Sequence, residues 1–242
     1  MNLAIDIGNT LTKCAVFNDD QIIQVLSFEY FDAGQAETIL TMFPKIKSVI
    51  LSSVVNHDQA LEEVFSNCFF ISLGHLTPLP IVNKYTSPET LGNDRLASAV
   101  AANYMFPYEN VLVIDAGTCI KYDFVNSENE YQGGGISPGI TMRFKALHSF
   151  TKKLPLLEQA KKTTLIGNST KESIWSGVQF GVLSEVRGII ALYEASAKNL
   201  KVLLTGGDSI FFDKELKNSI FVDSYLILKG LNNILNYNIS IK

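Results

Sequence analysis

The pattern Asp-x-Gly occurs twice in this chain, at Asp6 and again at Asp115, each time at the end of an apolar run. The first copy reads LAIDIGNTLTKCAVF from Leu3, and the second reads LVIDAGTCIKYDFV from Leu112. With one deletion, the two copies also align a glycine, a threonine and a lysine after the aspartate. In both copies a second apolar run follows the turn, so each copy predicts a β-hairpin.

Turns of this composition are suited to phosphate. Aspartate can hold Mg²⁺ directly or through water, glycine removes the Cβ that would block close approach, and threonine offers a hydroxyl and a backbone N–H. A lone Asp-x-Gly between strands is usually an ordinary hairpin turn. Two copies in register favour a duplicated fold that binds a nucleotide between its halves.

The rest of the sequence predicts two halves of similar order. In the first half we expect strands over 2–8, 12–18, 21–28, 48–53 and 68–72, with helices over 34–43, 58–66 and 94–106. In the second half we expect strands over 111–115, 119–125, 130–137, 200–205 and 219–222, with helices over 139–150, 170–197 and 225–235. Three strands followed by alternating helices and strands are typical of a ribonuclease-H-like domain. We therefore predict an α/β fold of two duplicated ribonuclease-H-like domains, 1–108 and 109–242, with a nucleotide cleft between them.

Local signals support several of these elements. Pro138 is expected at the first position of its helix, which proline favours. Ser169 and Glu172 have the spacing of a capping box before the long helix. That helix carries apolar residues over most of its circumference, as in a helix that is either fully buried or shared with a second subunit.

Composition excludes several classes of function. The net charge of −4 gives no basic surface for nucleic acid. No apolar run reaches the roughly 18 residues needed to cross a bilayer, and the first strand, with Asp6 in it, leaves no signal peptide. The three cysteines are widely spaced and match no zinc or disulfide pattern, which favours reduced thiols. We expect a cytoplasmic protein that binds neither nucleic acid nor a membrane.

Three further sequence motifs narrow the class of protein. They read GNDR from Gly92, GGGISPG from Gly133 and VLLTGGD from Val202. With the two Asp-x-Gly turns, the chain resembles the actin-like ATPase superfamily of acetate and sugar kinases, and within it the type III pantothenate kinases. The resemblance extends from residue 2 to about residue 235. It implies ATP-dependent phosphorylation of pantothenate to 4'-phosphopantothenate, the first step of coenzyme A biosynthesis.

The resemblance also implies a role for each matching residue. ATP, as its Mg²⁺ complex, would be bound by Asp6, Ile7, Gly8, Asn9, Thr10, Leu11, Thr12, Lys13 and Thr118. Pantothenate would contact Tyr85, Gly92, Asn93, Asp94, Arg95 and Thr170. Asp94 would be the catalytic residue acting on the substrate hydroxyl, and Asp115 would hold a monovalent cation, K⁺ or NH₄⁺. The family is dimeric, so a homodimer with pantothenate at the subunit interface is expected.

The chain departs from the family pattern after the second turn. It has Cys119, Ile120 and Lys121 where small or hydroxyl residues are usual, and Leu96 where tryptophan or isoleucine is frequent. We expect the lysine at position 121 to alter the binding of the cation or of ATP.

Two other functions stay open at this stage. One is another small-molecule kinase of the superfamily, acting on a sugar or a short acid, and the other is a non-enzymatic regulator with the same fold. Asp94 is also a plausible helix N-cap, and starting a helix would explain Thr170 almost as well as a substrate contact does.

Overall fold

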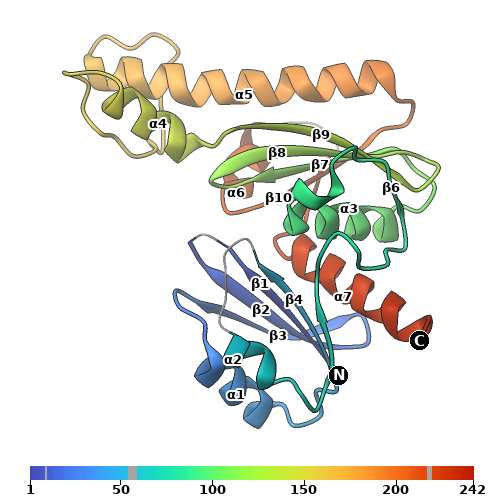
Figure 1. Ribbon diagram of the computed structural model, residues 1–242. Helices are drawn as coiled ribbons and strands as arrows, with labels where there is room; N and C mark the ends of the chain where they lie inside the picture. Colours follow the sequence, from blue (N-terminus) through green and yellow to red (C-terminus); the bar gives the residue numbers. More distant parts are fainter. Residues whose placement is uncertain (9, 54–58, 217–219) are drawn as a thin grey trace. The chain divides into compact units, whose positions relative to one another are not determined.

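The computed structural model describes residues 1–8, 10–53, 59–216 and 220–242. The chain forms two compact units. The first contains Met1–Pro107, Asn129–Gln132 and Tyr225–Lys242, and the second contains Tyr108–Glu128 and Gly133–Ser224. Each unit is built on a mixed β-sheet with helices on its faces (Figure 1).

The sheet of the first unit has the strand order β3-β2-β1-β4-β5. Its strands are β1 (Asn2–Ile7), β2 (Thr12–Asn18), β3 (Gln21–Phe28), β4 (Ser48–Ser53) and β5 (Phe69–Ser72). The first three form an antiparallel meander, whereas β4 runs parallel to β1 and β5 parallel to β4. The central strands β1 and β4 are buried on both faces, which explains their nearly continuous apolar sequences.

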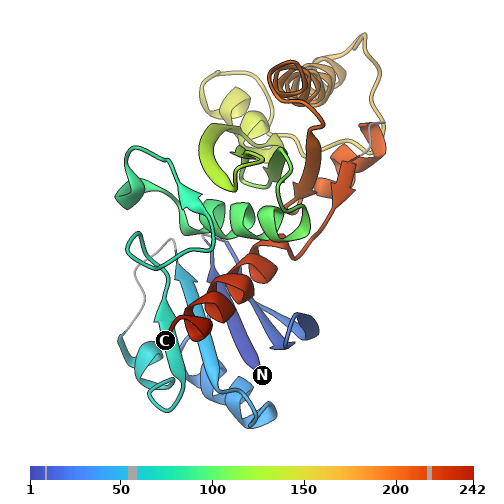
Figure 2. The same cartoon turned by 90° about the vertical axis from the view of Figure 1, so that its right-hand side faces the viewer.

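Two helices cover one face of this sheet and a third covers the other (Figures 1 and 2). On the first face lie α1 (Ala33–Met42) and α2 (Gln59–Glu63), whose apolar residues join the core of β1, β2 and β4. A capping box between Asp32 and Gln35 starts α1. Helix α2 is shorter than the predicted 58–66, and the predicted start at Asp58 lies outside the described residues.

The opposite face is covered by α7 (Leu226–Ser240), which packs on α3 (Asn93–Met105) and β1. A Cβ on Gly230 would lie 1.8 Å from the carbonyl oxygen of Ala97, so the two helix backbones meet where the glycine stands. The Asn2 amide also donates to Asn232 Oδ1 at 2.9 Å. These contacts place the C-terminal helix in the first unit, and the units therefore differ from the expected division into 1–108 and 109–242.

The second sheet has the order β11-β10-β7-β8-β9-β6. Its strands are β7 (Val111–Ala116), β8 (Cys119–Val125), β9 (Glu130–Pro138), β10 (Lys201–Thr205), β11 (Ile220–Val222) and β6 (Val82–Asn83). Strand β6 pairs with Glu130 and Tyr131, the part of β9 that belongs to the first unit. From β9 to β11 the order repeats that of β3 to β5, which confirms the predicted duplication.

The helices of the second unit are α4 (Ile140–Ser149), α5 (Thr170–Ser196) and α6 (Ser209–Glu215), and α5 lies along one face of the sheet (Figure 1). Ser169 caps α5 by accepting the Glu172 N–H at 3.3 Å. The Glu172 carboxylate accepts the N–H of Asn168, one residue before the cap. None of the helices in the described part of the chain is long and apolar enough to cross a membrane.

One predicted helix start is wrong. Pro138 is the last residue of β9 and not the first residue of α4. Gly139 is the N-cap, because its N–H is bonded to the carbonyl oxygen of Thr118 at 3.1 Å and holds the chain in an extended conformation at this point. A short 3₁₀ turn, Pro88–Thr90, precedes α3.

Candidate active site

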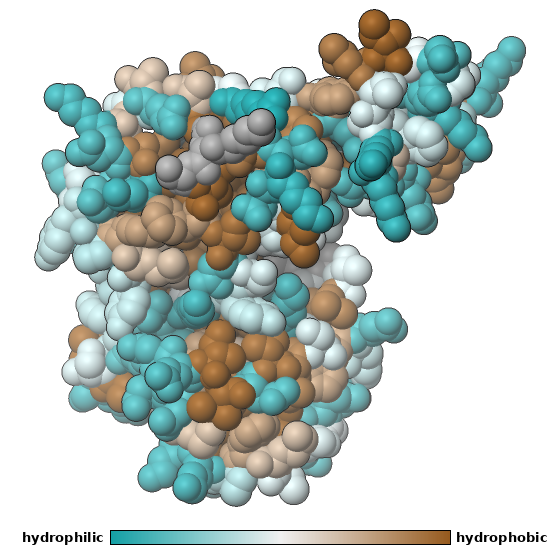
Figure 3. All heavy atoms as spheres, turned by 180° about the vertical axis from the view of Figure 1, so that it is seen from behind, coloured by the Kyte–Doolittle hydropathy of each residue, from teal (hydrophilic) through white to brown (hydrophobic). Residues whose placement is uncertain are grey.

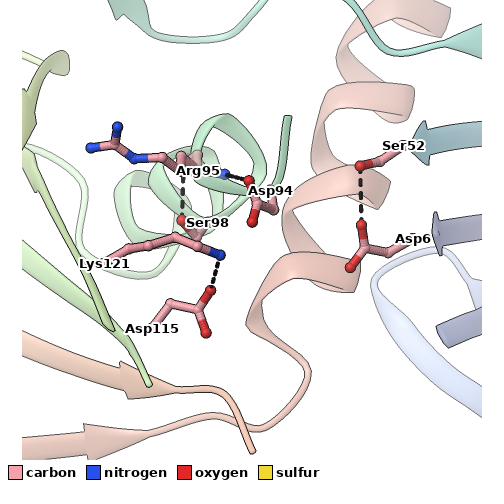
Figure 4. Close-up of polar contacts among 7 residues, drawn as sticks. All are labelled: Asp6, Ser52, Asp94, Arg95, Ser98, Asp115 and Lys121. Carbon is pink, nitrogen blue, oxygen red and sulfur yellow. Dashed lines mark hydrogen bonds and ion pairs between the residues drawn. The ribbon is translucent and has the colours of Figure 1, made fainter. Parts of the chain in front are cut away.

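The first Asp-x-Gly turn joins β1 to β2. Asp6 lies in β1 directly beside Ser52 of β4, and the Ser52 hydroxyl donates to Asp6 Oδ1 at 3.0 Å (Figure 4). The turn is closed by a hydrogen bond from the Gly8 N–H to the Leu11 carbonyl oxygen at 3.2 Å. The parallel pairing of β1 with β4 thus places a carboxylate and a hydroxyl together at the end of the sheet.

The residues predicted to bind ATP around this turn differ in accessibility. The side chains of Thr10 and Leu11 are exposed, and that of Lys13 is half-buried. Ile7 and Thr12 are buried, so their side chains belong to the core and only their backbone can face a ligand. Asn9 lies outside the described residues.

The second turn joins β7 to β8. Asp115 pairs with Lys121 across the antiparallel ladder, and the Lys121 Nζ lies 2.8 Å from Asp115 Oδ2 (Figure 4). Residues directly opposite each other on such a ladder point to the same face, which explains how the ammonium reaches the carboxylate. The Gly117 N–H closes the turn on the Cys119 carbonyl oxygen, and the Thr118 side chain is exposed.

Two glycines allow other backbone segments to pack on this second turn. A Cβ on Gly139 would lie 2.1 Å from the Gly117 carbonyl oxygen. Gly206 has φ +93°, and a Cβ there would lie 2.3 Å from the Ala116 oxygen and 2.6 Å from Asp115 Oδ1. The Gly-Gly run found in the sequence is therefore packed against the second Asp-x-Gly turn. Beside it, burial raises the pKa of the Asp208 carboxyl group.

The GNDR run begins α3. Gly92 is the N-cap and Asp94 is the second helical residue, so the interpretation of Asp94 as an N-cap is wrong. The Asp94 carboxylate turns back on the helix start and accepts the Arg95 N–H at 2.9 Å (Figure 4). A Cβ on residue 92 would lie 2.5 Å from Asp94 Oδ1, so glycine leaves the space that this carboxylate occupies.

Arg95 and Tyr85 come together in the first unit, although ten positions separate them in sequence. Arg95 is only 5% exposed, and its guanidinium carbon lies 5.6 Å from the centre of the Tyr85 ring. The Tyr85 ring stacks on Tyr131, with 6.2 Å between ring centres. Asn93 has a structural contact, because its amide donates to the Leu73 carbonyl oxygen at 2.8 Å.

Thr170 is the first residue of α5 in the second unit. It lines a cavity of about 1030 Å³ between α4, the start of α5 and the preceding loop. Polar residues on this cavity wall include Arg143, Asn168 and Ser169, and the apolar ones include Leu147 and Ile174.

Sequence reasoning missed a polar cluster around Glu185 of α5. Its carboxylate accepts hydrogen bonds from Tyr122 at 3.0 Å, Ser137 at 2.5 Å and Arg143 at 2.6 Å. Burial alone would raise the pKa of Glu185, but the hydrogen bonds from Ser137, Arg143 and Tyr122 outweigh it and lower this pKa. The cluster fixes α4 and α5 to β8 and β9. The signal in the sequence was a glutamate in a helix whose apolar residues recur at three-to-four spacing and form a stripe, namely Ile174, Val178, Val182, Val186 and Ile190.

The oxygens beside the first turn fit a divalent metal. Carboxylate and hydroxyl oxygens, as in Asp6 and Ser52, are the hard ligands that Mg²⁺ prefers. Among the described residues there is no group of three or more His, Cys, Asp and Glu side chains that could hold a metal by itself. Mg²⁺ with few protein ligands is the usual arrangement when substrate phosphates and water supply the others.

The duplicated strand order and the paired turns define the class. The fold is that of the actin-like ATPases and sugar kinases, and two solved structures share it. One is a Campylobacter jejuni protein classed with the Baf family of transcriptional activators (24% identity, TM-score 0.62, 98% of this chain and 99% of that chain). The other is the activator of 2-hydroxyisocaproyl-CoA dehydratase from Clostridium difficile with bound ADPNP (14% identity, TM-score 0.56, 99% and 94%). At these identities the likeness shows the fold alone.

Sequence comparison identifies the family. A family model described as type III pantothenate kinase matches residues 2–192. The type III pantothenate kinase of Phocaeicola vulgatus is 43% identical over 240 residues, which cover 98% of this chain and 99% of the relative. The chain belongs to the type III pantothenate kinase family.

Proposed function

We propose that this chain transfers the γ-phosphoryl group of ATP to the primary hydroxyl of pantothenate, forming 4'-phosphopantothenate, the first step of coenzyme A biosynthesis. The observation that carries the proposal is the pair of Asp-x-Gly hairpin turns, one in each unit, in a chain of this family. Phosphoryl transfer requires mainly positioning and charge neutralisation from the protein, and turns with aspartate, glycine and threonine can provide both.

In this proposal the first turn binds the phosphates and their metal. Asp6, oriented by the Ser52 hydroxyl, holds Mg²⁺, which would neutralise phosphate charge when bound. The backbone N–H of Thr10 and the side chain of the half-buried Lys13 contact phosphate oxygens, and Gly8 lets the backbone approach them closely. Thr118 of the second turn, whose side chain is exposed, contributes a further hydroxyl to ATP.

Asp94 is the proposed catalytic residue. Its carboxylate accepts a hydrogen bond from the pantothenate hydroxyl and orients the oxygen toward the γ-phosphate. A carboxylate is a weak base toward an alcohol, so orientation is the main contribution of Asp94 and the proton moves late. The glycine at position 92 supports this role, because it leaves space around the carboxylate.

Arg95 and Tyr85 are proposed to bind the other end of pantothenate. A guanidinium group matches the geometry of a carboxylate, and the Tyr85 ring already holds the Arg95 side chain in place. Gly92 and Asn93 shape the backbone beside them. Thr170, on the wall of its own cavity, is a further proposed substrate contact.

The monovalent cation implied by the family resemblance fits this chain poorly. The residue that would hold it, Asp115, already has the Lys121 ammonium 2.8 Å from its carboxylate. We therefore assign no step of the reaction to K⁺ or NH₄⁺.

We also propose that the protein is a homodimer formed through α5. One face of α5 presents the small residues Gly177, Gly181, Ser184 and Gly188, all of them exposed. A Cβ at any of the three glycines would meet no atom within 4 Å, although each costs an isolated helix about 1 kcal/mol relative to alanine. Small residues at this spacing allow a second helix to approach closely, which supports an α5–α5 contact.

Exposed apolar side chains of the second unit support the same proposal. Phe150 is 90% exposed, Leu165 72% and Ile166 84%. Figure 3 shows hydrophobic side chains at the end of this unit that carries α4 and the start of α5. Large apolar groups left in water are frequently covered by a partner, and symmetric pairing is the commonest closed assembly.

A coupled assay tests the activity. The purified chain with Mg·ATP and pantothenate is expected to release ADP, with 4'-phosphopantothenate detected by mass spectrometry. Glucose and N-acetylmannosamine serve as control acceptors. ADP release with a sugar and none with pantothenate would contradict the proposed substrate.

Light scattering tests the dimer. The wild-type protein is expected to have the mass of two 26.7 kDa chains. Gly181→Leu is expected to give the mass of one chain while keeping its circular dichroism, because its new side chain would point into open space. A single-chain mass for the wild type under conditions of full turnover would rule the dimer out.

A further inference from the structure

Lys121 and Asp115 form an ion pair at the residue that the family resemblance assigns to a monovalent cation. The two side chains are only 21% and 11% exposed, so solvent screens their attraction less than at the open surface. The β7–β8 register sets Lys121 directly opposite Asp115, and the two side chains share one face of the hairpin. The ion pair is therefore built into the strand pairing and does not depend on a loop conformation.

The other side of the Asp115 carboxylate is closely packed. Asp115 pairs with Thr205 of β10, and the following residue, Gly206, would bring a Cβ to 2.6 Å from Asp115 Oδ1. The carboxylate thus lies between the backbone of Gly206 and the ammonium of Lys121. Together these contacts hold a single positive charge at the second turn.

We infer that the Lys121 ammonium is a built-in replacement for the monovalent cation at Asp115, and that phosphoryl transfer by this chain needs neither K⁺ nor NH₄⁺. The inference rests on the proposed function. A primary ammonium carries the same charge as either ion and is, chemically, a tethered derivative of NH₄⁺. Tethering gives it a high effective concentration at the carboxylate, which a free ion at ordinary ionic strength does not match.

A free cation and the ammonium also exclude each other. Two like charges about 4 Å apart, at an effective dielectric constant of about 20, weaken each other's binding by roughly a thousandfold. K⁺ would therefore have to displace Lys121 from Asp115 in order to bind. In a chain with a small hydroxyl residue at position 121, the same carboxylate would be open to K⁺.

The matched variants are Lys121→Ser and Lys214→Ser. Lys214 is an exposed residue of α6 in the same unit, so its replacement removes the same charge away from Asp115. Each protein is assayed in choline chloride and in potassium chloride of equal concentration, and the ratio of the two turnover rates is compared. Using a ratio removes any effect that a variant has on its absolute rate.

The wild type and Lys214→Ser are expected to have ratios near one. For Lys121→Ser, the rate in choline should fall by roughly tenfold or more, the order of effect seen when one charge-stabilising group is lost, and K⁺ or NH₄⁺ should restore it. A wild type that turns over only with K⁺, or a Lys121→Ser variant indifferent to K⁺, would overturn the inference.

Thermal unfolding provides a readout that needs no activity. Replacing choline with K⁺ is expected to raise the melting temperature of Lys121→Ser and to leave that of the wild type and of Lys214→Ser unchanged, because only Lys121→Ser opens the carboxylate of Asp115 to a cation. Equal shifts in all three proteins would contradict the inference. If no protein phosphorylated pantothenate, the proposed function would fail, and the melting temperatures would still decide the role of Lys121.

Discussion

The two Asp-x-Gly turns have the same strand pairing but different chemistry. In both, the aspartate lies opposite a lysine in the hairpin and beside a hydroxyl residue of the next parallel strand, Ser52 in one unit and Thr205 in the other. At Asp6 the Ser52 hydroxyl donates a hydrogen bond and adds no charge. At Asp115 the lysine adds a full positive charge. The same strand pairing therefore brings a hydroxyl group to one carboxylate and an ammonium group to the other.

The second turn is also held by segments that lie outside its hairpin. Among the described residues, a Cβ on Gly8 would meet the Leu11 oxygen of its own turn, at 3.0 Å. The second turn is instead contacted by the backbones at Gly139 and Gly206, which come from two other segments. The shape of the second turn is therefore constrained by segments outside its own hairpin.

The largest expected effect distinguishes the proposed role of the two turns from the proposed role of Asp94 at the start of α3. If the turns bind the nucleotide and Asp94 orients the acceptor, Asp94→Asn should lower kcat by roughly 10²- to 10⁴-fold, the range for a positioned acid–base group, while Mg·ATP affinity stays unchanged. Steady-state kinetics and calorimetry measure both quantities. Glu89→Gln is the control, because it makes the same chemical change at an exposed residue nearby. Near wild-type turnover of Asp94→Asn would remove Asp94 from the mechanism.

A smaller effect tests the difference in packing. Gly139→Ala forces a Cβ against the Gly117 oxygen, and overpacking of this kind costs about 1–3 kcal/mol of unfolding free energy. Gly117→Ala, in the same turn, meets no atom within 4 Å and should cost about 0.5 kcal/mol or less. Urea denaturation of both variants measures the difference. Equal midpoints would mean that the second turn is not held by its neighbours.

The smallest expected effect concerns the neutral hydrogen bond at the first turn. Ser52→Ala removes the donor to Asp6 and should weaken Mg·ATP binding by about tenfold, the low end of the effect of losing one hydrogen bond to a charged group, because the contact acts on the metal through Asp6. Thr38→Ala is the control, since it removes a hydroxyl bonded to the Gly34 carbonyl oxygen in α1 of the same unit. If both variants bound Mg·ATP equally well, the Ser52 contact would have no part in positioning Asp6.

Much of the fold could be predicted because its signals are local. Continuous apolar runs identify β1, β4 and β7, and a stripe at three-to-four spacing identifies α5 almost to the residue. The packing of α7 in the first unit could not be predicted in this way. It depends on the fit of Gly230 against Ala97, which are far apart in the sequence.

The same limit applies to the candidate site, where contacts between residues far apart in the sequence could not be predicted. Asp6 and Asp115 are visible in the sequence because their neighbours form recognisable turns, and Asp94 is visible because its GNDR run matches the family pattern. Hairpin register could also have predicted the Lys121–Asp115 contact, since the two residues are equally spaced about the turn. The Glu185 cluster could not, because its donors come from β8, β9 and α4 and meet only in the folded unit.

The central claim is that both Asp-x-Gly turns serve ATP, and Mg·ATP titration calorimetry on Asp6→Asn and Asp115→Asn tests it most directly. Asp6→Asn removes the proposed metal ligand, and Asp115→Asn removes the charge that holds the Lys121 ammonium. Each is expected to weaken Mg·ATP binding by about tenfold or more, the order of one or two charge-assisted contacts, with pantothenate binding unchanged. Wild-type Mg·ATP affinity in both variants, or a loss confined to pantothenate, would contradict the account.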